Sequence, residues 1–205
     1  MVMQWIRPAP SEIGWAKMGG PTTEGAFMLS AAEFIHAGLT QLHKNFDKAV
    51  SDLSPEQLHT VPGGHPKANT IAFVLWHYVR TEDNVVRYVI QDRRPTVWVE
   101  GGYGEKLGLH PAAQGTGMSA ADAQALRIKD VALFKDYMRQ VWASTDELFG
   151  SGNAAVLDKT VLVRPLGEMP AIRALGNVCF GHGQAHFGEI ELARTLIGVA
   201  PAVGI

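Results

Sequence analysis

The sequence predicts a single all-α domain, most simply a four-helix bundle. Four long segments carry apolar residues at every third or fourth position, which is the period of an amphipathic helix. Almost no segment alternates between apolar and polar residues as a half-buried strand does. The chain has 205 residues, and a domain usually contains about 100–200. We therefore expect one bundle domain over residues 29–198, preceded by an extended arm over residues 1–28, which are rich in proline and glycine.

The first two helices are expected over residues 29–53 and 69–90. In the first, the apolar positions with helical spacing are Ile35, Leu39, Leu42, Phe46, Ala49 and Leu53. The second begins at Asn69 or Thr70, since either side chain can cap a helix. Residues 91–118 then form a connector of a length that is uncommon in compact domains. Its Trp98 and Tyr103 fit two interpretations, a lid or binding loop and a loop fastened to the bundle by its aromatic residues.

The third and fourth helices are expected over residues 119–149 and 170–197. Ser119 and Asp122 can form a capping box at the start of the third helix. The connector that follows contains "TVLV", which is compatible with an extended segment. Pro170 suits the first turn of the fourth helix, and Gly198 suits its end.

Composition and charge narrow the possible functions. Hydrophobic residues make up 46% of the chain and charged residues 19%, as in ordinary globular proteins. The net charge of -2 gives no electrostatic basis for binding nucleic acid. We find neither an apolar run of ~18 residues, as a membrane span requires, nor the features of a signal peptide. One cysteine, Cys179, excludes an internal disulfide, so we expect a cytoplasmic protein.

Two histidines occupy positions on the fourth helix that should face the core. At about 100° per residue, one stripe contains Leu175, Cys179, His182, His186, Glu189 and Ala193. Burying two unpaired imidazoles would be costly, so these side chains need partners. Histidines four residues apart on a helix point the same way and can hold one cation.

The second helix offers a third imidazole. His77 shares a stripe with Phe73, Thr81, Asn84 and Tyr88, and it is the only histidine predicted within that helix. Facing helices in a bundle lie about 8–10 Å apart, so residues from both can reach one ion. His77, His182 and His186 thus form a candidate three-nitrogen metal site with one open face, as catalytic zinc sites have.

The other histidines are weaker candidates. His36 and His43 flank the core stripe of the first helix, where we expect partial exposure. His59, His65 and His110 lie in predicted loops and have no helical partner.

Several other residues near the histidines allow two interpretations. Glu189 could orient a ligand histidine or move a proton, but the simpler interpretation is a partly exposed residue near the helix end. Cys179 could be a fourth ligand, although a lone buried cysteine is more often part of the core. Arg80, Glu82 and Asp83 are better explained as a salt-bridged helix face than as catalytic groups.

The order of these motifs resembles the DinB-like superfamily of damage-inducible proteins. The stretches that carry the resemblance are "TIAFVLWHYVRTEDNVVRYVIQDRRPTVWVEGGYGEKLGL", "GTGMS" and "HGQAHFGEIELARTLIG", within residues 30–198. The resemblance implies a bundle with up-down-down-up helices, often dimeric, that binds a divalent metal through His77, His182 and His186. Characterised relatives are thiol-dependent S-transferases and isomerases that use mycothiol, bacillithiol or glutathione.

The function expected from this resemblance is activation of a low-molecular-weight thiol by one divalent metal ion, zinc or nickel, for S-transfer or isomerisation of a small electrophile. The substrate would bind under the loop of residues 91–118, and the protein would be a homodimer. Two alternatives remain open: a non-catalytic stress protein with a structural metal, and a metal-dependent hydrolase with Glu189 as general base.

Overall fold

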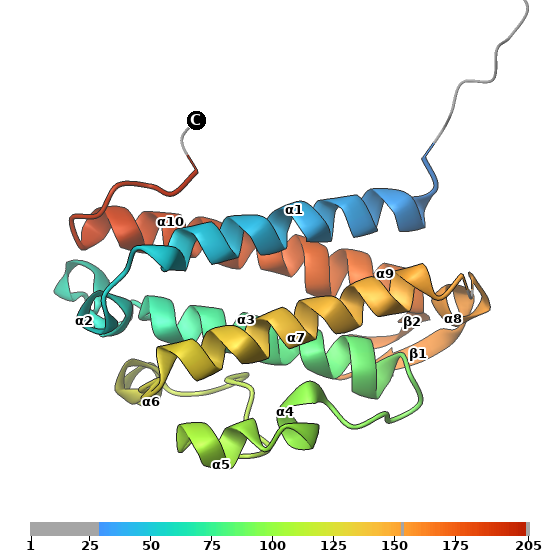
Figure 1. Ribbon diagram of the computed structural model, residues 1–205, viewed down its shortest axis with the longest axis horizontal. Coiled ribbons are helices and arrows are strands. Elements are labelled where there is room, and N and C mark those ends of the chain that lie inside the picture. The colour runs from blue at the N-terminus through green and yellow to red at the C-terminus, as the bar shows by residue number, and fades with distance from the viewer. Residues whose placement is uncertain (1–28, 153, 204–205) are drawn as a thin grey trace, which may run out of the picture.

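Four long helices lie side by side in the computed structural model, which describes residues 29–152 and 154–203 (Figure 1). They are α1 (Ala31–Ser51), α3 (Ile71–Asp83), α7 (Val131–Gly150) and α10 (His182–Leu196). α1 and α10 run in one direction, and α3 and α7 run in the other. Each packs against two of the others: α10 lies against α3 and α1, and α7 lies against the same two. The mostly helical architecture confirms the predicted all-α class.

The first helix starts at a capping box that was not predicted from the sequence. The Ser30 side chain accepts from the backbone N–H of Glu33, and the Glu33 carboxylate accepts from the backbone N–H of Ser30. Helix α1 is followed by the short helices α2 (Pro55–His59) and η1 (Pro62–Gly64), which lead to α3. Thr70, one of the two predicted caps, is the N-cap of α3.

Two of the predicted helices contain a π-helical segment. Helix α3 continues directly into η2 (Asn84–Val89), and α10 is preceded by α9 (Ala171–Ala174) and η3 (Leu175–Gly181). A π-helical turn contains more residues than an α-helical turn and occurs often at functional sites. The two segments pack against each other. Both predicted helices are therefore continuous through a π-helical segment, and the side of the helix that faces the core changes along their length.

The predicted helix over residues 119–149 is wrong in one respect, since it is two helices. Ser119 caps the short helix α6 (Ala120–Ala125), and Asp130 caps α7 by accepting from the backbone N–H of Leu133. Between the helices, Leu126 and Ile128 turn into the core and are 8% and 3% exposed. Burial of these two apolar side chains and the second cap together favour the break.

The long connector carries two short helices that are fastened to the bundle. These are α4 (Val97–Glu100) and α5 (Tyr103–Leu107). The rings of Trp98 and Tyr103 each lie 5.0 Å from the ring of Tyr137 on α7, and both are buried. The Asp83 carboxylate accepts the backbone N–H groups of Val97 and Trp98 at 2.8 and 3.0 Å. This part of the connector therefore follows the second interpretation, a loop fastened by its aromatic residues.

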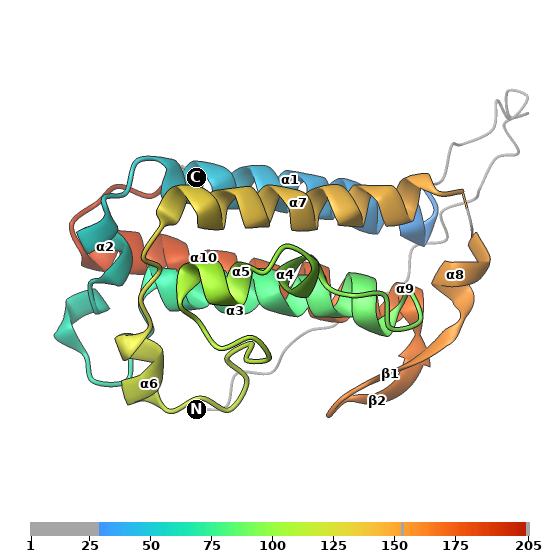
Figure 2. The same ribbon diagram turned by 60° about the horizontal axis from the view of Figure 1, so that its bottom comes forward.

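A small β-hairpin joins α7 to the fourth helix. After α8 (Ala154–Asp158), strands β1 (Thr160–Val163) and β2 (Gly167–Pro170) pair antiparallel, with Thr160 opposite Pro170 and Val163 opposite Gly167. The "TVLV" segment is thus extended, as the sequence allowed. Strand β1 packs against η2, and the hairpin projects from the side of the bundle near the end of α3 (Figure 2). No helix in the described ranges is long and apolar enough to span a membrane.

The helix face at Arg80, Glu82 and Asp83 is salt-bridged, as predicted, since Nη1 of Arg80 lies 3.4 Å from Oδ2 of Asp83. It is also buried, because the three residues are 4%, 0% and 1% exposed. Glu82 accepts from Thr145 at 2.6 Å and lies 3.0 Å from Nε2 of His43, which is buried rather than partly exposed. The reason is that α7 packs against α3 and the His43 side chain reaches Glu82 from α1, so both helices cover this side of α3. The predicted arm, residues 1–28, lies outside the described residues.

Candidate metal centre

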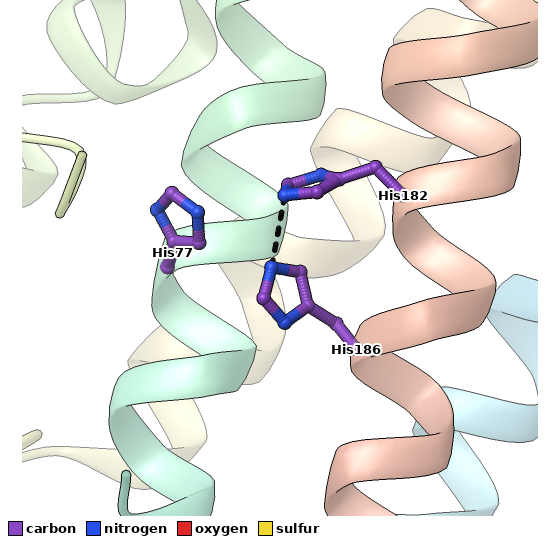
Figure 3. A group of neighbouring side chains, drawn as sticks. All are labelled: His77, His182 and His186. Atoms are coloured by element: carbon purple, nitrogen blue, oxygen red, sulfur yellow. Dashed lines mark hydrogen bonds between the residues drawn. The ribbon is translucent and has the colours of Figure 1, made fainter. Parts of the chain in front are cut away.

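The three predicted histidines come together between two helices. His77 projects from α3, and His182 and His186 project from α10 toward it (Figure 3). Each offers one ring nitrogen, and these atoms all lie within 4.8 Å of one another. Nε2 of His182 and Nε2 of His186 are 2.9 Å apart. The sequence spacing therefore identified a real cluster of imidazoles.

A glycine sets the close approach of α10 to its neighbours. A Cβ atom at Gly183 would lie 2.5 Å from the ring of Tyr78 on α3 and 2.7 Å from the side chain of Leu42 on α1. Such distances are too short for packed carbon atoms. The glycine between His182 and His186 thus allows the helix to approach closely enough for its histidines to meet His77.

Hydrogen bonds behind two of the rings determine which nitrogen faces the cluster. Nδ1 of His77 faces the backbone carbonyl of Gln114, and Nδ1 of His186 lies 3.0 Å from Oε2 of Glu189. A carbonyl or carboxylate oxygen only accepts, so both Nδ1 atoms carry the proton and donate. Each Nε2 is left with a free lone pair, as metal coordination requires.

The rings of the cluster are suited to neutral coordination. Burial, with the charge of His186 adding to it, lowers the pKa of His77. Burial and the two neighbouring imidazoles lower the pKa of His182 to about 4. These two rings are therefore uncharged near neutral pH, which is the state that binds a metal ion. The hydrogen bond from His186 lowers the pKa of Glu189, so its carboxylate remains ionised.

The donor set fits a divalent metal ion. Two Nε2 atoms 2.9 Å apart would repel each other through their lone pairs unless a proton or a cation lay between them. In tetrahedral zinc sites, bond lengths of about 2.0–2.1 Å place the nitrogens about 3.3 Å apart. The separations in the cluster bracket that value. Within residues 29–152 and 154–203, no fourth histidine, cysteine or carboxylate joins the group, so a fourth position is open.

Cys179 does not lie on the same side of the helix as the histidines, although the sequence predicted one shared stripe. It is fully buried and packs in an apolar cluster with Leu175 and Val86. The π-helical segment η3 ends just before His182, which rotates the histidines away from the side that Cys179 occupies. Burial raises the pKa of the Cys179 thiol well above its ordinary value. The residue is therefore part of the core, as the simpler interpretation expected.

Glu189 has contacts that its position near the helix end did not reveal. It is partly exposed, as the simpler interpretation expected, with 36% of its side chain accessible. Its Oε2 nevertheless contacts His186, and its Oε1 accepts from Nδ2 of Asn69, just before α3, at 3.0 Å. Glu189 thereby connects the two helices that carry the histidines.

The cluster opens into a cavity of about 1180 Å³. All three histidines line it. So do the other residues of the stripe that contains His77, namely Phe73, Thr81, Asn84 and Tyr88. The hairpin forms another part of the wall. A space of this size is ample for a small organic molecule, because ligand pockets usually measure about 300–1,000 Å³.

One segment of the long connector covers His77. Besides the Gln114 carbonyl that accepts from its ring, Gly115 lies so close that a Cβ atom there would be 2.9 Å from Nδ1 of His77. Sequence reasoning missed both residues. Gln114 acts through its backbone, which carries no sequence signal, and the pair of glycines in "GTG" was the available clue.

The remaining histidines have other partners. His36 pairs with Asp146, and Nε2 of His59 accepts from the backbone N–H of Ile128. His65 and His110 each accept from a backbone N–H two residues later in their own loops.

Comparison with known proteins adds a family model and a fold. The model described as the DinB superfamily matches residues 39–190. The crystal structure of a conserved protein from Enterococcus faecalis has a TM-score of 0.71 with this chain at 15% sequence identity. The alignment covers 83% of this chain and 98% of that chain. At this identity the likeness concerns the fold alone. No curated protein matches the sequence.

Proposed function

The chain belongs to the DinB superfamily, as its motifs predicted, and from this premise we propose a metal-dependent enzyme that activates a low-molecular-weight thiol. The reaction would be S-transfer to a small electrophile or isomerisation of one. The observation that carries this proposal is the convergence of three Nε2 atoms, two of them with acceptors behind the ring, on a cavity large enough for a substrate.

Each residue of the site would have a defined part. His77, His182 and His186 would hold one divalent ion, of which zinc and nickel suit imidazole ligands. The ion would supply positive charge, which lowers the pKa of a bound thiol and favours the reactive thiolate. Glu189 would keep the proton on Nδ1 of His186 and fix the orientation of that ring, and the Gln114 carbonyl would do the same for His77.

Three observations support thiol chemistry over the alternatives. Structural zinc sites usually have four protein ligands, whereas the described residues bring three into this group. A hydrolase needs a general base that is free to take a proton from water. The candidate base, Glu189, already accepts from His186 and Asn69 with its two oxygens. A buried Cys179 with a raised pKa is a poor nucleophile of its own, so an external thiol fits better.

A titration with cobalt tests the proposal. The purified full chain would be analysed for metal, loaded with Co²⁺ and titrated with cysteine, glutathione and 2-mercaptoethanol while its absorption spectrum is recorded. A thiol that coordinates the ion should produce a new sulfur-to-cobalt absorption band, and the zinc form should then accelerate reaction of that thiol with 1-chloro-2,4-dinitrobenzene. A Co²⁺ protein whose spectrum is unchanged by all three thiols would contradict thiol activation and favour a structural metal.

We also propose that the protein is a homodimer. Leu192 and Leu196 on α10 are 61% and 51% exposed, which supports a partner on that face. Light scattering should then give about twice the chain mass of 22.2 kDa, whereas the monomer mass over a wide concentration range would exclude the dimer.

A further inference from the structure

The cavity extends well beyond the three histidines. Tyr88 follows His77 by eleven residues along α3 and η2, and both line the cavity. At a rise of about 1.5 Å per residue, this is roughly 15 Å along the helix axis. A metal ion and a small thiol would fill only the histidine end. The hairpin end must therefore accommodate another part of the substrate.

The hairpin end of the cavity carries unpaired positive charge. The charged residues that line it, the histidines aside, are Asp92, Arg93, Lys159 and Arg164. Lys159 Nζ lies 2.8 Å from Asp92 Oδ1, so these two charges neutralise each other. The guanidinium groups of Arg93 and Arg164 have no hydrogen bond or ion pair with any residue of the described ranges. Arg93 adjoins Asp92, whose partner Lys159 directly precedes β1, and Arg164 directly follows β1, so the two arginines lie at opposite ends of this strand along the cavity wall.

The backbone at Arg93 is strained. Asp92 and Arg93 have φ values of 53° and 65°, in the left-handed region of the backbone that residues other than glycine rarely adopt. Strain of this kind is concentrated at functional sites. Asp92 and Arg93 both line the cavity, so the strained turn lies at the candidate site.

Apolar side chains lie beside these arginines. Tyr88, Leu162 and Leu166 all line the cavity and are 45%, 50% and 61% exposed. Three large apolar residues that face one cavity are unlike scattered surface residues, because an apolar ligand would remove them all from water together. The same wall thus combines apolar surface with two free guanidinium groups.

We propose that the cavity selects an apolar organic acid, whose carboxylate is attracted to the positive charge of Arg93 and Arg164 on the cavity wall. Its apolar body would lie along Tyr88, Leu162 and Leu166, and its other end would face the three histidines. Guanidinium groups bind a carboxylate through paired, charge-assisted hydrogen bonds, which gives both affinity and orientation. The identification of this acid as the electrophilic substrate rests on the proposed function, but the binding preference does not.

Calorimetric titration with three molecules that share one apolar body tests this preference. The probes are 4-phenylbutyrate, 4-phenylbutanamide and 4-phenylbutylamine, titrated into the full chain as purified. We expect the anion to bind at least about tenfold more tightly than the neutral amide, and the cationic amine to bind most weakly. In the Arg93→Gln/Arg164→Gln double variant, the preference for the anion should fall below about threefold, with the affinity for the amide unchanged.

Arg173→Gln provides the matched control, because Arg173 is exposed on α9 and does not line the cavity. This variant should keep the full preference. Equal binding of anion and amide, binding of none of the probes, or loss of the preference in Arg173→Gln as well would overturn the proposal. So would a preference that survives in the double variant and disappears on chelation, since the carboxylate would then bind at the histidines. Thiol coordination is measured separately with Co²⁺, so the two proposals can fail independently.

Discussion

His186 and Glu189 lie one turn apart on α10, and Nδ1 of the imidazole donates to Oε2 of the carboxylate at 3.0 Å. The second carboxylate oxygen accepts from Asn69, which precedes α3. One side chain thus fixes the orientation of a candidate ligand and connects it to the helix that carries His77. This relationship gives Glu189 a positioning role that its sequence position alone does not reveal.

Glu189→Gln should therefore weaken metal binding without unfolding the protein. Loss of the carboxylate behind a ligand histidine typically lowers metal affinity by about 10- to 100-fold. Competition with a chromogenic chelator would measure the affinity. Gln184→Ala changes an exposed residue of the same helix and should leave it unaltered. Equal affinities in wild type and Glu189→Gln would show that the carboxylate does not support the site.

Gly115→Ala should disturb the site more than Gly117→Ala. Both glycines have positive φ, 91° and 76°, so both substitutions strain the backbone. Only at position 115 would the new Cβ lie 2.9 Å from Nδ1 of His77, whereas nothing lies within 4 Å of position 117. We expect Gly115→Ala to lower metal affinity by about tenfold or more, and Gly117→Ala to affect thermal stability alone. A similar loss of affinity in both variants would point to loop strain instead of the contact with His77.

Gly183→Ala and Gly188→Ala should change stability in opposite directions. A methyl group at position 183 would collide with Tyr78 and Leu42, and overpacking of this kind costs about 1–3 kcal/mol. Position 188 is exposed, with nothing within 4 Å of a new Cβ, so alanine should stabilise the helix there by up to about 1 kcal/mol. Urea unfolding would measure both. Unchanged stability in Gly183→Ala would mean that α10 has room to move away from α3.

Glu82→Gln should lower stability at neutral pH and reduce its dependence on acid. Burial alone would raise the pKa of Glu82, but the charge of His43 and hydrogen bonds from His43 and Thr145 hold it below its ordinary value of 4.5. A lowered pKa in the folded state means that the stabilisation is complete above about pH 4.5 and is lost as the pH falls through the lowered value. At pH 7 the variant should be less stable by about 3 kcal/mol, because His43 stays buried without its partner.

Urea unfolding of wild type and Glu82→Gln between pH 7 and pH 3 would test this. The difference in their unfolding free energies should narrow below about pH 4.5. Glu105→Gln removes the same charge from an exposed position that forms no ion pair within residues 29–152 and 154–203, and it should shift stability by less than about 0.5 kcal/mol. A difference that stays constant over the whole range would mean that Glu82 is not ionised in the folded protein.

Features that depend on local spacing were predictable from the sequence. His182 and His186 could be identified because they share one face of a helix. His77 could be identified because it was the only histidine predicted within the second helix. The Ser119 cap was visible for the same reason, since its side chain accepts from the backbone N–H of Asp122, three residues later. The break before α7 was missed because its cause is the second cap at Asp130 together with the burial of Leu126 and Ile128.

Features that depend on tertiary packing could not be read from periodicity. A helical wheel assumes constant turns, and η3 violates that assumption just where Cys179 and the histidines were placed on one face. Glu82 and Asp83 are buried because helices pack on both sides of α3. The sequence gives no sign of this burial, because charged residues are usually exposed. Arg93 and Arg164 line the same cavity only because the hairpin folds against η2.

Metal analysis of single histidine variants tests most directly whether His77, His182 and His186 form one metal site. Wild type purified without chelator should contain about one divalent ion per chain. The variants His77→Ala, His182→Ala and His186→Ala should each retain less than about a tenth of that amount. His110→Ala, in an exposed loop, should match wild type. Full metal content in His77→Ala, or none in wild type under metal-replete conditions, would contradict a site shared between α3 and α10.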